Sequence, residues 1–93
     1  GVEITNPADN TTRTLPLDGL FVAIGLEPEN GAFAEVAALD AAGYFDSSED
    51  CLTKSDGIFV AGDCRTKRIR QVTTAASDGA VAAISACRYI DGL

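Results

Sequence analysis

Two pairs of residues in the last third of the chain have types and positions suited to binding a ligand. Gly62 and Asp63 end an apolar run, and Arg70 and Gln71 precede an alanine-rich segment. Ligands of open α/β sheets bind beyond the carboxyl ends of the strands, where an aspartate can accept hydrogen bonds from sugar-like hydroxyl groups. A helix starting at Arg70 and Gln71 would offer free N–H groups and positive dipole charge to an anion or an electron-rich carbonyl. The pattern therefore predicts a binding edge made of a strand end and a helix start.

Local physical chemistry also allows a structural role for the same segment. Asp63 can cap the turn that follows it. The basic residues can form a solvated loop that offsets the acidic remainder of the protein; they are Arg65, Lys67, Arg68 and Arg70. The spacing of these residues leaves the structural and the binding alternatives open.

The composition excludes several classes of site and partner. The 93 residues are enough for at most one compact domain, and the absence of histidine excludes a Ser-His-Asp triad, a Cys-His pair and a histidine-ligated zinc site. We expect no metal site. A net charge of -7 disfavours nucleic acid and anionic membranes as partners. No apolar run approaches the roughly 18 residues of a membrane span.

The cysteines and the missing methionine bear on compartment and completeness. Cys51, Cys64 and Cys87 include no Cys-x-x-Cys pair, and an odd number cannot close into an intramolecular framework. We therefore expect a reduced, cytoplasmic chain with Cys51 in a loop and Cys64 and Cys87 as small apolar fillers. Because the chain has no methionine, we expect Gly1 to be an internal position of a longer protein.

The first part of the chain predicts a hairpin followed by a buried strand. Val2–Thr5 alternates apolar and polar residues, a turn-forming segment follows, and Leu15–Leu17 resumes the pattern. The continuous apolar run Leu20–Ile24 is typical of a strand buried on both faces. The run Asp56–Ala61 repeats Asp18–Ala23 almost letter for letter and predicts a second such strand.

The remaining segments predict one long helix and several short elements. The alanine-rich run 71–90 predicts a helix ended by Asp91 and Gly92, and its apolar residues surround the helix so widely that we expect burial on more than one side. The segment 32–39 has modest helical spacing, and 43–45 predicts a short strand before a polar loop. Residues 27–31 are the expected crossing between two structural units.

These motifs together resemble a known family. The run Gly57–Val72, with Thr74–Ala76 and Asp78–Ala83, is similar to the second FAD-binding motif of bacterial thioredoxin reductases. Gly19–Gly25 and Pro28 resemble the same family's passage out of the domain that binds the nicotinamide cofactor. Arg88–Asp91 resembles the closing helix of that family. The resemblance therefore covers the whole length of this chain, and it corresponds to the carboxyl-terminal portion of a thioredoxin reductase.

The resemblance implies a fold class and domain boundaries. The fold is expected to be α/β, part of a flavoprotein with two dinucleotide-binding domains. Residues 1–25 would be the final strands of the NAD(P)H-binding domain, 26–31 the interdomain crossing, and 32–93 the carboxyl-terminal part of a Rossmann-like FAD-binding domain.

The resemblance also implies a site and a reaction. Gly62 and Asp63 would hold the ribityl and pyrophosphate region of FAD, while Arg70, Gln71 and Val72 would border the flavin ring. Positive charge at the helix start would stabilise the negative charge of the reduced ring. The parent would pass electrons from NADPH through FAD and a Cys-x-x-Cys pair to thioredoxin, and would be a homodimer. No residue of this chain is expected to be catalytic.

Several parts of that machinery are absent from these residues. The Gly-x-Gly-x-x-Gly fingerprint, the NADPH phosphate loop and the Cys-x-x-Cys pair do not occur here. We therefore expect the isolated chain to be inactive, to bind FAD weakly or not at all, and to associate with itself or other chains. The alternatives are a tail of the flavin subunit of alkyl hydroperoxide reductase, a tail of a ferredoxin-NADP reductase of the same fold, or a cofactor-free interaction module.

Overall fold

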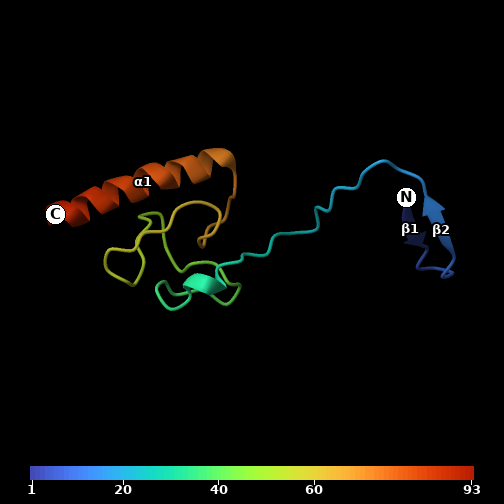
Figure 1. Ribbon diagram of the computed structural model, residues 1–93, viewed down its shortest axis with the longest axis horizontal. Helices are drawn as coiled ribbons and strands as arrows, with labels where there is room; N and C mark the ends of the chain where they lie inside the picture. The colour runs from blue at the N-terminus through green and yellow to red at the C-terminus, as the bar shows by residue number, and fades with distance from the viewer.

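The computed structural model describes all residues, 1–93, and is elongated, with principal extents of 65 × 26 × 20 Å. A hairpin of β1 (Val2–Thr5) and β2 (Thr12–Leu15) lies at one end. An extended connector leads to a body that contains η1 (Gly31–Phe33), irregular loops and α1 (Val72–Asp91) (Figure 1). No helix combines the length and the apolarity that crossing a membrane needs.

The hairpin confirms the expectation for the first part of the chain. β1 and β2 pair antiparallel, from Val2 opposite Leu15 to Thr5 opposite Thr12. Side-chain hydrogen bonds stabilise the tip of the hairpin, where the Asn6 carboxamide oxygen accepts the Ala8 N–H at 2.9 Å. The second strand ends at Leu15, where the prediction has it begin, because Pro16 has no N–H to donate to a further rung.

The predicted buried strand at Leu20–Ile24 does not form in this chain. The segment is extended but unpaired, and Phe21 is 98% exposed. No backbone–backbone hydrogen bond involves residues 16–29. A strand needs a neighbour to satisfy its N–H and C=O groups, and none of the 93 residues lies beside this run. The expected parallel sheet is therefore not assembled within this chain.

The core of the body is small and lies between loops. Ala37, Phe45 and Val60 are buried, and partly buried apolar residues pack around them, namely Leu39, Ile58 and Cys64. The Phe45 N–H donates to the carbonyl of Cys64 at 3.0 Å, and the Thr66 N–H donates to the carbonyl of Phe45 at 2.9 Å. These two bonds form a single parallel bridge between the loops.

The short elements predicted in the body are reduced in the same way. The strand expected at 43–45 is represented by isolated bridges at Phe45 alone, and the strand expected at Asp56–Ala61 by one antiparallel bridge between Leu52 and Phe59. The helical spacing of 32–39 produces only the three-residue turn η1. Each prediction places its element correctly but assigns it too much regular structure. A strand needs several consecutive partner residues on a neighbouring segment, and this chain supplies only one.

α1 confirms the long predicted helix. It begins after Gln71 and ends at Gly92, whose φ of 73° is the left-handed conformation that glycine adopts readily at a helix end. The expectation of burial on more than one side is wrong. The covered residues form a single stripe, and the opposite face, including Ile84 and Ile90, is exposed.

Candidate functional site

The site is built on the loop between Val60 and α1, and it begins at Gly62. Gly62 is buried and has a φ of 92°, in the left-handed region that favours glycine. Its N–H donates to Oδ2 of Asp78, on α1, at 2.9 Å. This bond attaches the start of the loop to the second turn of the helix.

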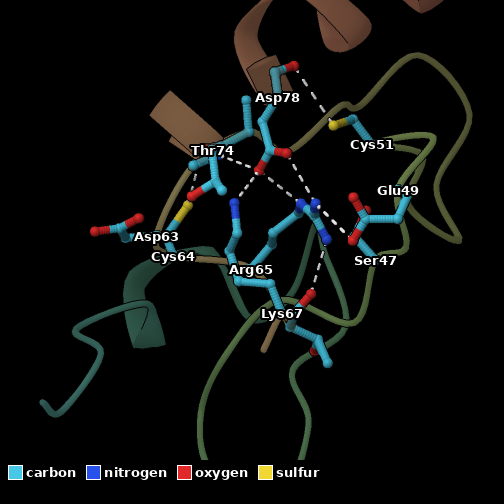
Figure 2. A network of polar contacts seen from close by, with 12 residues as sticks. Ser47, Glu49, Cys51, Asp63, Cys64, Arg65, Lys67, Thr74 and Asp78 are labelled. Carbon is cyan, nitrogen blue, oxygen red and sulfur yellow. Dashed lines mark hydrogen bonds and ion pairs between the residues drawn. The ribbon is translucent and has the colours of Figure 1, made fainter. Parts of the chain in front are cut away.

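Asp78 is the centre of a buried ion-pair network (Figure 2). Arg65 donates to it with both sides of its guanidinium, from Nε to Oδ2 at 2.7 Å and from Nη2 to Oδ1 at 2.8 Å. Lys67 adds a contact from Nζ to Oδ2 at 2.8 Å. The side chains of Arg65, Lys67 and Asp78 are 1%, 4% and 6% exposed. Two cations and one backbone N–H therefore share a single carboxylate away from solvent.

This network sets the protonation states of its members. The hydrogen bonds from Arg65 hold the pKa of the Asp78 carboxyl well below its usual range, although burial acts in the opposite direction. Asp78 in turn raises the pKa of Arg65. Glu49 also contacts Arg65, with 3.1 Å between Oε1 and Nη2, but it is largely exposed and contributes less.

The low pKa of Asp78 predicts a loss of stability in acid. Because this pKa is lower in the folded than in the unfolded state, the ionised carboxylate stabilises the fold above about pH 4, and this contribution is lost as the pH falls further. We expect the free energy of unfolding to decrease below about pH 4, and to decrease less steeply in Asp78→Asn. Urea unfolding between pH 2 and 6 measures both slopes. Equal slopes in the two proteins would contradict the assignment.

Arg70 forms the second half of the site, beside Asp63. Its guanidinium carbon lies 3.8 Å from the centre of the Tyr44 ring, a cation–π contact. Its Nε donates to the backbone carbonyl of Asp63 and its Nη2 to that of Arg65, both at 3.0 Å. Asp63, Arg70 and Tyr44 line a pocket of about 250 Å³, together with Cys64 and residues 26–30.

Asn30 lines the pocket at the end of the connector. Its Nδ2 donates to the carbonyl of Gly43 at 3.0 Å and to that of Cys64 at 2.8 Å. The side chain is buried, so these bonds replace those to water. The carboxamide joins three segments that are far apart in sequence and fixes the last residue of the connector to the body.

The structure brings some of the predicted site residues together. Asp63 and Arg70 line the same pocket, Gly62 precedes them as a buried turn residue, and Gln71 and Val72 begin α1 directly after Arg70. The Gln71 N–H donates to Oγ1 of Thr74 at 3.0 Å. Gln71 and Val72 are exposed and do not line the pocket.

The sequence allows two structural roles for this segment: Asp63 as a cap of the turn, and the basic residues as a solvated loop. The Asp63 carboxylate is exposed and makes no hydrogen bond, so it does not cap the turn; in Figure 2 it points away from the Asp78 network. The idea of a solvated basic loop is wrong for Arg65 and Lys67, which are buried on Asp78, and for Arg70, which is held by two carbonyls.

Cys51 lies in a loop and Cys64 packs against the core, as expected, but the expectation of a filler role for Cys87 is wrong. Cys51 is fully buried, with its Sγ 3.5 Å from the backbone carbonyl of Asp78, whereas Cys87 is exposed on α1. Burial, and then the Asp78 charge, raise the pKa of the Cys51 thiol, so it is protonated at neutral pH. Cys51 therefore has the role of the apolar filler that was assigned to Cys87.

Sequence reasoning missed Asp78, Asn30 and Tyr44. A usable signal existed for Asp78, because an acid in the interior of an alanine-rich helix must be exposed or paired, and four basic residues precede it nearby. No comparable signal marks Asn30 or Tyr44, whose partners are distant in sequence.

A comparison with models of protein families shows to which family this chain is related. Residues 2–79 match the model described as pyridine nucleotide-disulphide oxidoreductase. The chain belongs to that family. Since the match covers most of the chain, membership does not depend on a single motif of this oxidoreductase family.

Comparisons with individual proteins show which members of the family this chain is similar to. The chain is 37% identical over 93 residues to the thioredoxin reductase of Listeria monocytogenes, covering 100% of this chain and 29% of the relative. It is 46% identical over 82 residues to that of Treponema pallidum, covering 88% of this chain and 26% of the relative. The resemblance to thioredoxin reductases is therefore confirmed, and the chain spans about three tenths of the relatives' length.

Solved structures of the family support the fold. The thioredoxin reductase of Streptococcus pyogenes matches with a TM-score of 0.78 and 30% identity, covering 98% of this chain and 30% of that one. That of Lactococcus lactis matches with a TM-score of 0.78 and 32% identity, covering 96% and 29%. The comparisons support a Rossmann-like flavoprotein fold for the protein. The domain boundaries at residues 25 and 31 stay a prediction.

Proposed function

We propose that this chain supplies one wall of an FAD site in a longer protein that transfers electrons from NADPH to the disulfide of thioredoxin. The observation that carries the proposal is that Asp63, with its free carboxylate, and Arg70 line one pocket next to the start of α1. The relatives named thioredoxin reductase support the substrate class.

The residues present fit one part of FAD. The Asp63 carboxylate has no partner within the protein and can accept hydrogen bonds from the hydroxyl groups of the ribityl chain. The first turn of α1 offers N–H groups without partners inside the helix, which suit an electron-rich carbonyl. A pocket of about 250 Å³ is too small for the whole cofactor, in keeping with a single wall.

Each residue has a defined task in this proposal. Asp63, on the turn fixed by Gly62, binds the ribityl and pyrophosphate region. Arg70, Gln71 and Val72 border the flavin ring, where the helix start favours negative charge. FAD, when bound, accepts a hydride from NADPH and passes electrons to a disulfide. The chain's own contribution is to bind and orient that ring.

The division between residues 1–25 and residues 32–93 is part of the proposal, and the separation of the hairpin from the body supports it. Residues 1–25 contain the hairpin, which lies apart from the body formed by residues 32–93 (Figure 1). The connector between them is longer than the crossing proposed at 26–31, since residues 16–29 make no backbone–backbone hydrogen bond. A homodimer and thioredoxin as partner belong to the same proposal.

Asp63→Ala in the longer protein tests the proposal. We expect it to weaken FAD binding by about 10- to 100-fold, because a charge-assisted hydrogen bond to the cofactor is lost. Flavin absorbance after gel filtration, and titration of the apoprotein with FAD, measure the effect. Asp46→Ala is a matched control, because Asp46 is exposed and paired with Lys54. Unchanged flavin affinity in Asp63→Ala would refute the assignment.

The cofactor-free interaction module is the weaker candidate. The chain does expose large apolar side chains, including Phe21 and Ile24. Phe21 and Ile24 lie on the connector, and others, including Ile84 and Ile90, lie on α1. A partner bound at these side chains would leave the unpaired Asp63 carboxylate without a role. Absence of flavin from the purified longer protein would favour this candidate.

A further inference from the structure

Asp78 is connected to the pocket through the backbone of the loop that carries Asp63. We propose that Asp78 is a positioning residue, which orients the Asp63 carboxylate toward FAD by fixing the turn at Gly62. The inference rests on the proposed function. Asp78 contacts neither the pocket lining nor, in this proposal, the cofactor.

The loop is held on both sides of Asp63. On the amino side, the Gly62 N–H donates to Oδ2 of Asp78 at 2.9 Å, and the φ of 92° at Gly62 sets the direction in which the chain enters Asp63. On the carboxyl side, Arg70 Nε donates to the Asp63 carbonyl at 3.0 Å. The backbone of Asp63 therefore has little freedom, although its side chain makes no contact of its own.

The two holding points are joined by Arg65. Its guanidinium binds both oxygens of Asp78, and its backbone carbonyl accepts a hydrogen bond from Nη2 of Arg70 at 3.0 Å. A displacement of Asp78 would thus reach Asp63 by two routes, directly through Gly62 and indirectly through Arg65 and Arg70.

The number of donors around Asp78 explains why a carboxylate is needed there. Gly62, Arg65 and Lys67 together present four hydrogen bonds to its two oxygens. An asparagine has one acceptor oxygen and an NH2 group that would face these donors. Three of the four bonds go to Oδ2, from Gly62, Arg65 Nε and Lys67, and one goes to Oδ1, from Arg65 Nη2. An amide oxygen in the Oδ2 position leaves Nη2 of Arg65 facing the NH2 group, and one in the Oδ1 position leaves the other three donors, including the Gly62 N–H, without an acceptor.

A double-mutant cycle in the longer protein separates positioning from general stability. Its members are Asp78→Asn, Asp63→Ala and the double variant, and the measurement is the Kd for FAD by flavin fluorescence titration of the apoprotein. We expect Asp78→Asn to raise the Kd about tenfold, and to raise it less than about twofold when Asp63 is already alanine. Asp46→Asn is the matched control, with no expected change, because Asp46 is exposed and outside the network.

The outcomes distinguish this inference from the function on which it rests. An equal effect of Asp78→Asn in both backgrounds would overturn the positioning role while leaving the FAD site intact. No effect of Asp63→Ala would overturn the FAD assignment itself. If Asp78→Asn does not fold, Arg65→Lys takes its place, since it retains the charge but loses the two-sided guanidinium contact. A smaller effect that again requires Asp63 supports the inference, and an effect independent of Asp63 overturns it.

Discussion

Replacing Asp78 with alanine is expected to lower the free energy of unfolding by about 3–5 kcal/mol, because it leaves buried cations without a counter-charge. Arg65 and Lys67 are 1% and 4% exposed and have Asp78 as their shared acidic partner. Glu49 contacts Arg65 from solvent and cannot replace the buried carboxylate. The Gly62 N–H loses its acceptor as well. Urea unfolding of the 93-residue chain at pH 7 measures the change.

Asp46→Ala provides the matched control for this result. Asp46 also forms an ion pair, with 2.9 Å between its Oδ2 and Nζ of Lys54, but both side chains are substantially exposed. Such pairs contribute about 0–1 kcal/mol. Similar losses for Asp46→Ala and Asp78→Ala would show that burial does not set the strength of the Asp78 network.

Phe45→Ala is expected to lower the free energy of unfolding by about 3 kcal/mol, at the low end of the range for a buried phenylalanine. Phe45 lies in the small core with Ala37 and Val60, and its backbone forms the bridge to the loop of Cys64. The loss is limited because an apolar groove of about 400 Å³ adjoins the ring, so neighbouring side chains and water can reach the space that the substitution leaves. Urea unfolding measures this change also.

The same substitution at Phe21 tests the exposure of the connector. Phe21 is 98% exposed, so Phe21→Ala should alter the stability of the 93-residue chain by less than about 0.5 kcal/mol. A loss comparable to that of Phe45→Ala would mean that Phe21 is covered in solution, for example by a second copy of the chain.

Elements whose contacts are local could be predicted from the sequence. The hairpin depends on alternation and on side chains of its own tip, such as Asn6. The helix depends on alanine content and on Gly92 at its end. In both elements the hydrogen-bond partners are close along the chain, at most from Val2 to Leu15 in the hairpin, so the local pattern determines the structure.

Elements that need distant partners could not be predicted to the same extent. Leu20–Ile24 and Ile58–Ala61 have nearly the same composition, yet the first is exposed and unpaired, while the second contributes Val60 to the core. A strand pattern states that a segment can pair, but it does not supply the neighbour. α1 is buried along a single stripe for the same reason, because this chain contains no neighbour for the opposite face of the helix.

The same distinction between local and distant contacts applies to the residues of the candidate site. The shared position of Asp63 and Arg70 could be predicted, because Asp63 follows a strand-like run and Arg70 precedes the helix. Asp78, Asn30 and Tyr44 act through contacts with residues up to 34 positions away, as in the bond from Asn30 to Cys64. Such contacts become visible only when the loops are placed in space.

The attachment of Asn30 determines where the molecule can bend. Residues 16–29 have no backbone–backbone hydrogen bonds, whereas Asn30 is bound to the carbonyls of Gly43 and Cys64. A swing of the hairpin relative to the body is therefore taken up by torsion angles upstream of Asn30. The loop from Gly62 to Arg70 keeps its geometry during that swing, so large changes in the orientation of residues 1–15 can occur without any displacement of Asp63.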